Sequence, residues 1–372
     1  MNTVDTAPLA HLRNSKLGFL SQAWTGDARY YSFVLLTILL WIVGANIIAA
    51  LLPDSIITSS QRGVHWLRQA SVFAVVFTAY YGLYVIYLSR KTLTNMSEFK
   101  NAITNIRENP YSLLRPPLMA VLGLISIAGF FFAYSTIKTR IPVFNDYSWD
   151  IAFYKLDQIL FFGNDPWKAF DFLYDYPIVI KSLDTLYSVI WPILLFGSWV
   201  TCFASRRHSV HRRIQYCLAI LLSWFIGGNL LAIVFASVGP VYFGEFTNLA
   251  SPYIEQMQLL ASIHETQTLG AFTYQEYLMD VYKSGSYGLG GISAMPSMHI
   301  TTAILFIFMF GKNIIMRSLL IAYAVIIYFT SFILAWHYAV DGLLSIPIAI
   351  GGWYLSGWIL RYFASRSALS NT

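Results

Sequence analysis

The feature that most constrains this chain is a series of apolar stretches, each about as long as a membrane is thick. A helix rises about 1.5 Å per residue and the hydrocarbon core of a bilayer is about 30 Å thick, so about 20 largely apolar residues cross it. Eight stretches fit, the sixth of them short: Tyr30–Leu52, Leu67–Leu88, Pro117–Ile137, Ile178–Phe203, Ile214–Val238, Met295–Phe310, Ile315–Ala335 and Val340–Leu360. The sequence therefore predicts an all-α polytopic membrane protein with about eight transmembrane helices.

The composition excludes an ordinary soluble domain. Hydrophobic residues make up 57% of the chain and charged residues 11%, whereas soluble domains carry about 25% charged residues. The net charge is +6, but Lys and Arg fall in short clusters between the apolar stretches rather than in one patch. This pattern is typical of membrane topology, so we expect no nucleic-acid partner.

The positions of Lys and Arg predict the orientation in the membrane. With the N-terminus inside, the cytoplasmic segments hold 16 of the 24 Lys and Arg residues but only 4 of the 18 acids. These segments are 1–29, 90–116, 204–213, 311–317 and the C-terminal tail. Because positive residues favour the cytoplasmic side, we expect both termini in the cytoplasm. The long connections 138–177 and 239–294 are then extracytoplasmic, on the periplasmic or lumenal side.

The first of these connections predicts an interfacial helix near 147–175. Its apolar residues recur at helical spacing, at Trp149, Phe153, Leu156 and Leu160. They predict a face that packs against lipid or the bundle, with Asp150 and Asp157 lying off that stripe. Taken alone, this segment is explained by a packing role without chemistry.

The first candidate site lies at the outer end of the sixth stretch, in the run Gly290-Gly291-Ile292-Ser293-Ala294-Met295-Pro296-Ser297-Met298-His299. We expect Ser293 to cap a helix that carries Pro296 in its first turn. A helix N-terminus after a glycine-rich loop binds anions through free N–H groups and its dipole. Ser297 adds a hydroxyl donor, and His299 is placed to deliver a proton. An ordinary capped helix start has the same pattern, so this run alone does not define a site.

The second candidate site begins thirty-eight residues later, at His337. Asp341 follows at i+4, where it shares a helix face with His337 and reaches one ring nitrogen, leaving the other nitrogen free to attack. Asp341 is the only acid in the last three stretches, and ionisable residues in membrane spans usually mark function. Two consecutive antiparallel stretches join the two sites, so we expect them at the same extracytoplasmic level. Together they supply the groups that phosphoryl transfer requires.

Pro296-Ser297-Met298-His299 and His337-x-x-x-Asp341 resemble the second and third signature motifs of the type 2 phosphatidic acid phosphatase superfamily. The resemblance implies a six-helix catalytic core preceded by two extra helices. It also implies roles: His337 is the nucleophile that forms a phosphohistidine, Asp341 orients it, His299 protonates the leaving group and Ser297 helps to hold the phosphate. The chain then divides into 1–116 (tail, two helices and a basic loop), 117–362 (core with the interfacial helix) and 363–372 (cytoplasmic tail).

The sequence departs from the superfamily where phosphate-binding cations are expected. The first motif, Lys-x6-Arg-Pro, is replaced by Gly239-Pro240-Val241-Tyr242, and Thr330-Ser331 stand where the third motif begins Ser-Arg. The branch that contains the inositol phosphorylceramide synthases also departs there. The amphipathic segment of that branch is similar to the run in this chain that contains Asp150, Asp157, Gly163 and Pro166.

The remaining candidate phosphate-binding groups are Gly290, Gly291, Ser297, Lys283 and Tyr242. Lys138, Arg140 or Lys181 would add charge if the fold brings them in. A phosphodiester carries one negative charge and a phosphomonoester nearly two at neutral pH. A site with few cations therefore favours the diester and transfer of its headgroup.

These observations predict an extracytoplasmic lipid phosphotransferase or phosphatase with membrane lipids as its partners. Transfer to a lipid alcohol and hydrolysis to inorganic phosphate share the first step. A transporter is the remote alternative, because the middles of the stretches are nearly free of charge; a catalytically lapsed scaffold is a third. We expect no metal and no cofactor, since Cys202, Cys217 and the His and carboxylate residues form no close ligand set.

Overall fold

The structure is a computed structural model, in which residues 31–52, 104, 115–205, 208–284 and 290–369 are described. These residues form helices, connected by turns and short extended segments, and contain no strand. The all-α fold class predicted from the sequence is therefore confirmed for the described part of the chain.

Six helical segments in the described residues are long and apolar enough to cross a membrane. They are Tyr31–Leu51, Leu118–Phe144, Pro177–Ala204, Val210–Val234, Ile314–Ile333 and Ala339–Phe363. The predicted sixth stretch forms a shorter apolar helix, α14 (Met298–Phe310), and the predicted stretch Leu67–Leu88 lies outside the described residues. The predicted count of eight is thus not confirmed, although the six long helices are.

Three of these spans consist of consecutive shorter elements. The first combines α4 (Arg115–Lys138) with α5 (Ile141–Phe144). The next combines α7 (Pro177–Thr185), η3 (Leu186–Ile190) and α8 (Trp191–Ala204), and the third α9 (Val210–Phe225), η4 (Ile226–Leu231) and α10 (Ala232–Val234). The turns η3 and η4 are π-helical, a distortion that often occurs at functional sites. The last two spans are formed by α15 (Ile314–Ile333) and by α16 (Ala339–Leu369).

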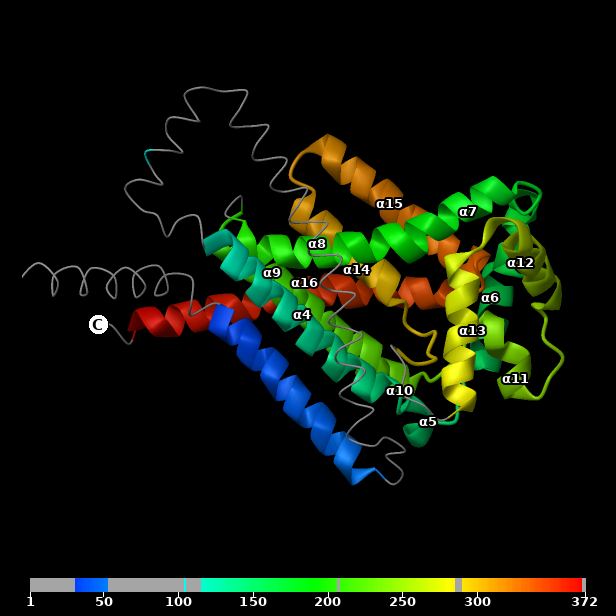
Figure 1. The fold of residues 1–372 in the computed structure, drawn as a ribbon, viewed down its shortest axis with the longest axis horizontal. Coiled ribbons are helices and arrows are strands. Elements are labelled where there is room, and N and C mark those ends of the chain that lie inside the picture. The colour runs from blue at the N-terminus through cyan, green and yellow to red at the C-terminus, as the bar shows by residue number, and fades with distance from the viewer. Residues whose placement is uncertain (1–30, 53–103, 105–114, 206–207, 285–289, 370–372) are drawn as a thin grey trace, which may run out of the picture.

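Shorter helices form a cap over one end of this bundle (Figure 1). The cap consists of α6 (Asp150–Leu160), η2 (Pro166–Leu173), η5 (Pro240–Tyr242), α11 (Phe243–Thr247), α12 (Ile254–Gln267) and α13 (Gly270–Lys283). It comes from the two long connections between spans, so segments far apart in sequence meet above the ends of α15 and α16. The turns between α8 and α9 and between α14 and α15 lie at the opposite end.

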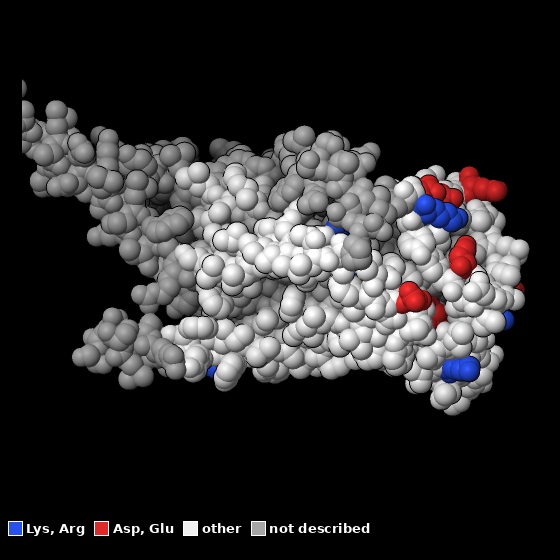
Figure 2. Space-filling model, turned by 90° about the horizontal axis from the view of Figure 1, so that it is seen from below, with Lys and Arg blue, Asp and Glu red and all other residues white. Residues whose placement is uncertain are grey.

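The sides of the bundle are apolar. Figure 2 shows acidic and basic side chains gathered mainly over the cap, while the described part of the bundle on that face is nearly free of charge. Large apolar side chains on α15 and α16 are exposed, among them Ile315, Leu319 and Trp358. Exposed apolar side chains along helices of membrane length are favourable against lipid and unfavourable against water. With six long apolar helices among its described residues, the protein is therefore an integral membrane protein.

Buried amide side chains attach the cap to the C-terminal end of α15. Gln256 Nε2 of α12 donates to the carbonyl oxygens of Phe332 (2.7 Å) and Ile333 (3.1 Å). Gln275 Nε2 of α13 donates to the carbonyl oxygen of Leu334 (2.9 Å). The last carbonyl groups of a helix have no partner within it, and the cap supplies donors to them in addition to the N–H of Ala335, which bonds to the carbonyl oxygen of Phe332 at 3.1 Å.

Helix α6 buries one residue of its apolar stripe together with its two carboxylates. Asp150, Phe153 and Asp157 are buried, whereas Leu156 and Leu160 are more than 40% exposed. Apolar periodicity predicted that Phe153 and the leucines face lipid or the bundle, with the two carboxylates off that face. The carboxylates face the protein instead, because each accepts hydrogen bonds from backbone N–H groups that would otherwise be buried without partners.

We expect Gln256→Leu to destabilise the protein by about 1–3 kcal/mol, because it removes two buried hydrogen bonds of about 0.5–1.5 kcal/mol each. The hydroxyl of Tyr174 and the N–H of Ala335 remain as the donors to the carbonyl oxygens of Ile333 and Phe332. The measurement is the thermal unfolding midpoint of the protein in detergent. Glu265→Gln, an exposed change on the same helix, is the matched control and is expected to leave the midpoint unchanged. Equal midpoints for Gln256→Leu and the control would contradict this account of how the cap is attached.

Candidate functional site

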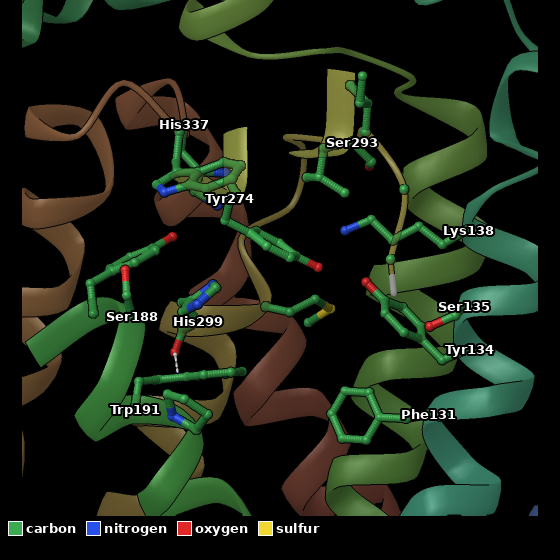
Figure 3. Close-up of a pocket in the computed structure, with 18 of the residues that line it drawn as sticks. Phe131, Tyr134, Ser135, Lys138, Ser188, Trp191, Tyr274, Ser293, His299 and His337 are labelled. Atoms are coloured by element: carbon green, nitrogen blue, oxygen red, sulfur yellow. Dashed lines mark hydrogen bonds between the residues drawn. The ribbon is translucent and has the colours of Figure 1, made fainter. Parts of the chain in front are cut away.

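A cavity of about 530 Å³ lies at the capped end of the bundle (Figure 3). This volume is in the range typical of sites for small ligands, roughly 300–1,000 Å³. Among the residues that line it are His299, His337, Gly290, Gly291, Tyr242 and Lys138. The fold therefore brings both candidate histidines, which are 38 residues apart, to the wall of one cavity.

His337 precedes α16, in the short turn that follows α15. Its Nδ1 lies 3.1 Å from Oδ2 of Asp341, and the same oxygen accepts the backbone N–H of Tyr338 at 3.1 Å. The predicted i, i+4 pairing is therefore present in the structure. An Nδ1–H that donates to this carboxylate leaves Nε2 of His337 with its lone pair available.

The environment of His337 favours the neutral imidazole. Burial, and next the positive charge of Lys138, lower the pKa of His337 to about 3, while the carbonyl group of Ala294 acts in the opposite direction. A neutral imidazole is the nucleophilic form of histidine, because protonation removes the lone pair. The ring is thus held in the form that attack on phosphorus requires.

His299 is held between two aromatic rings. The ring centroids of Tyr187 on η3 and Trp191 on α8 each lie 4.0 Å from that of His299. The indole N–H of Trp191 also donates to the carbonyl oxygen of His299 at 3.0 Å. These contacts fix the imidazole beside the cavity, and neither aromatic residue was predicted from the sequence.

The two buried carboxylates of α6 hold the turn that presents His337. Asp157 accepts the N–H groups of Ala339 (2.8 Å) and Val340 (2.9 Å), which are the first two of α16. Asp150 accepts the hydroxyl of Tyr338 at 2.7 Å, and it also accepts backbone N–H groups of the segment before η5. Carboxylates at a helix N-terminus are favourable because they meet its free N–H groups and its positive dipole end.

The segment before α14 differs from the prediction. The helix begins at Met298, and Ser297 rather than Ser293 occupies the cap position, without a side-chain capping bond. The backbone N–H of Ala294 donates to the carbonyl oxygen of Ser237 at 2.8 Å. This contact keeps the segment extended along the cavity, so the helix starts four residues later than a cap at Ser293 implies.

Gly290 and Gly291 both line the cavity, and both have steric reasons to be glycine. Gly290 has φ +104°, a conformation that side chains rarely adopt. A Cβ at Gly291 would lie 2.9 Å from the carbonyl oxygen of Lys138. The glycine pair therefore lets the 290–297 segment pass against the end of α4, in addition to any contact that its backbone makes with a ligand.

The other predicted groups are distributed as follows. Tyr242 lines the cavity, and its hydroxyl donates to the carbonyl oxygen of Gln275 at 2.7 Å. Ser297 is fully buried beside the site, with no hydrogen-bond partner for its hydroxyl among the described residues, and is not part of the wall. Lys283 is exposed at the end of α13 and does not line the cavity.

The deeper wall of the cavity is aromatic. Phe131 from α4, Phe196 from α8 and Trp224 from α9 line it, and all three belong to membrane spans. A cavity with charged and polar groups near the cap and aromatic groups at the depth of the spans suits an amphipathic ligand.

The fold and the site define a polytopic membrane protein with a histidine-based cavity at the capped end of its helix bundle. The family model of the PAP2 superfamily matches residues 151–355, which is more than half of the chain, and the protein therefore belongs to this superfamily. The match begins in α6 and ends in α16, so it contains both histidine motifs, whereas α4 lies outside it. No curated protein and no solved structure matches the chain.

We expect Asp157→Asn to reduce the pH dependence of stability. Burial, and to a smaller extent the negative charges of Asp341 and Asp165, raises the pKa of Asp157 to about 7. The hydrogen bonds from two backbone N–H groups act in the opposite direction. The folded protein thus binds this proton more tightly than the unfolded chain, in which the pKa of Asp is about 4. The contribution of Asp157 to the free energy of unfolding therefore falls as the pH rises from about 4 to about 7.

The thermal unfolding midpoint is measured at about pH 5 and at about pH 7.5, and the difference between the two midpoints is compared among the variants. The pKa of Asp157 in the folded protein, about 7, lies between these two pH values. Asp157→Asn should lower the midpoint at about pH 5, relative to the midpoint at about pH 7.5, in comparison with the wild type. Asp171→Asn, an exposed change in the cap, should behave as wild type. A wild-type difference in Asp157→Asn would mean that this carboxyl group is not responsible.

Proposed function

We propose that this protein is a membrane-embedded lipid phosphotransferase or phosphatase that acts through a phosphohistidine on His337. Membership of the PAP2 superfamily and the apolar helices fit this class of enzyme. The observation that carries the proposal is the buried pair of His337 and Asp341, which shares the wall of one cavity with His299.

In the first step, Nε2 of His337 attacks the phosphorus atom of a phospholipid. A nitrogen–phosphorus bond forms and the bond from phosphorus to the leaving oxygen breaks. His299, whose protonated form the negative charge of the bound phospholipid favours, gives its proton to that oxygen, so the leaving group departs as a neutral alcohol. Asp341 accepts Nδ1–H of His337 and stabilises the positive charge that the ring acquires as it is phosphorylated.

In the second step, a hydroxyl group attacks the phosphohistidine. The neutral His299 takes the proton of the attacking hydroxyl, and the nitrogen–phosphorus bond breaks. Water as the acceptor releases the phosphorylated group by hydrolysis, whereas a lipid alcohol gives headgroup transfer. Both outcomes restore His337 and the protonated His299, so the sequence of steps balances.

We favour transfer from a phosphodiester donor to a lipid alcohol, as in the inositol phosphorylceramide synthase-like branch. Lys138 is the one Lys or Arg among the described residues that line the cavity. Because the proton of His299 passes to the leaving group, Lys138 is the one permanent cation in the described wall of the cavity, and it matches the single charge of a diester better than the nearly two charges of a phosphomonoester. Release of inorganic phosphate from a lipid phosphate monoester is the second candidate function.

We place this site on the extracytoplasmic side. Arg212 lies at the opposite end of the bundle from His337, where its guanidinium donates to the carbonyl oxygen of Phe308 at 2.6 Å. Lys312 and Arg317 lie in the turn between α14 and α15, at that same end. Positive residues are favoured on the cytoplasmic side, so their position supports an extracytoplasmic cap and cavity with both termini in the cytoplasm.

We expect His337→Ala to abolish turnover and the covalent phosphoenzyme, because no other group in the proposal attacks phosphorus. Purified protein is given phosphatidate, phosphatidylglycerol or phosphatidylinositol, with and without ceramide or diacylglycerol, and products are identified by mass spectrometry. His211→Ala, at the start of α9 far from the cavity, is the matched control. Equal product from His337→Ala and the control would overturn the proposal.

The same assay separates the two candidate functions. Product that appears only with a lipid alcohol supports transfer. Free phosphate released from phosphatidate without an acceptor would make the protein a lipid phosphatase.

We expect Asp341→Asn to lower the turnover rate by about 10²–10⁴ while the protein remains folded, since the substitution keeps the shape but loses the charge that supports His337. The rate is measured beside the thermal unfolding midpoint of the same sample. Wild-type turnover in Asp341→Asn would refute the role given to this carboxylate.

A further inference from the structure

We infer that Lys138 is the cation that binds the phosphate group of the lipid substrate, in place of the Lys and Arg residues absent from the superfamily motifs. The inference rests on the proposed function for the identity of the ligand. It concerns a residue of α4, outside the part of the chain that the family model matches. Four observations support it.

First, Lys138 ends a face of α4 that forms one wall of the cavity. Phe131, Tyr134, Ser135 and Lys138 all line the cavity, and their spacing of three, one and three residues places them on one side of the helix. In Figure 3 the side chain of Lys138 extends from α4 into the cavity, on the side opposite His337. The α4 wall is thus aromatic at depth and cationic at the level of the histidines.

Second, the ammonium group of Lys138 is unpaired by any acceptor among the described residues. Its contact is with the ring of Tyr134, whose centroid lies 5.5 Å from Nζ. Of the three other cations that the sequence offered, Lys283 does not line the cavity, and the other two are engaged elsewhere. Arg140 donates to the carbonyl oxygen of Thr136 at 2.6 Å, and Lys181 lies 3.3 Å from Oδ2 of Asp184.

Third, the described wall of the cavity contains no carboxylate. Neither Asp nor Glu is among the residues that line it, because Asp150 and Asp157 are turned toward backbone N–H groups and Asp341 lies behind His337. A half-buried cation without a counter-ion is costly. An anionic ligand in the cavity supplies the missing charge.

Fourth, the backbone fixes Lys138 to the segment that carries the histidine motif. Gly291 packs so closely on the end of α4 that a Cβ there would lie 2.9 Å from the carbonyl oxygen of Lys138. Lys138, His299 and His337 line the same cavity. A phosphate held by Lys138 therefore lies among the groups that the proposed reaction uses.

A purely structural role accounts for less of this arrangement. A lysine in the last turn of a helix is favourable because it faces the negative end of the helix dipole. Such a lysine usually approaches the last carbonyl groups, but Lys138 donates to none of those described. The helix dipole explains why a cation is favourable at this position. Binding of an anion in the cavity explains why the side chain of Lys138 extends into the cavity.

The test measures binding without turnover, in protein that carries His337→Ala. Affinities are determined for phosphatidylglycerol and for diacylglycerol with the same acyl chains, by native mass spectrometry in detergent. Lys138→Gln should weaken phosphatidylglycerol binding roughly 10- to 100-fold, the effect typical of losing a hydrogen bond to a charged group. Diacylglycerol binding should not change, and Lys138→Arg should keep most of the affinity for phosphatidylglycerol.

Lys155→Gln, an exposed lysine of the cap, is the matched control and should bind both lipids as the parent does. Unchanged phosphatidylglycerol binding in Lys138→Gln would overturn the inference, as would a loss that appears in Lys283→Gln instead. A parallel loss of diacylglycerol binding would also overturn it, because that result indicates a structural role. Inorganic phosphate is titrated in the same samples, and Lys138-dependent binding of phosphate but not of phosphatidylglycerol would overturn the assignment to a lipid.

The two proposals fail in different ways. If His337→Ala keeps turnover while Lys138→Gln loses phosphatidylglycerol binding, the phosphohistidine is wrong and the phosphate-binding role of Lys138 stands. If turnover depends on His337 while binding does not depend on Lys138, the chemistry stands and another group holds the phosphate.

Discussion

The arrangement of the site depends on the carboxylate of Asp157 at the start of α16. This side chain comes from the cap, 182 residues before Ala339, and accepts the first two N–H groups of α16. Because His337 and Asp341 flank this helix start, the position of α6 also sets the position of the candidate nucleophile. Asp150 adds a second tie through the hydroxyl of Tyr338. The cap therefore positions the histidine rather than only covering it.

The distribution of charge follows from the same contacts. The buried carboxylates are engaged by N–H and hydroxyl donors outside the cavity, so Lys138 is left as the charged lining residue beside two histidines. Had either α6 carboxylate faced the cavity, it would neutralise the lysine and repel an anionic ligand. The polar contacts that hold the turn thus also keep the cavity receptive to a phosphate group.

Patterns local in sequence predicted the fold class and the main chemistry. Apolar stretches of membrane length predicted six of the long helices, and the i, i+4 spacing of His337 and Asp341 predicted their contact. The burial of Asp150 and Asp157 on α6 was not predicted, because apolar periodicity carries no information about backbone donors supplied by a distant helix. The prediction that Ser293 caps the helix was wrong for a similar reason, since a hydrogen bond to the backbone of Ser237 holds that segment extended.

The sequence by itself determined that the chain is an α-helical membrane protein and which His and Asp residues form a pair. These properties depend on residue type and on separations of a few residues, so they can be inferred before the fold is known. Only the tertiary structure decided which cation faces the histidines. Lys138, Arg140, Lys181 and Lys283 are equivalent in the sequence, and packing of Gly291 on the end of α4 places Lys138 at the cavity while Lys283 remains exposed. The reason is physical: a charge acts over a few ångströms in space, and distances between remote segments are set by packing.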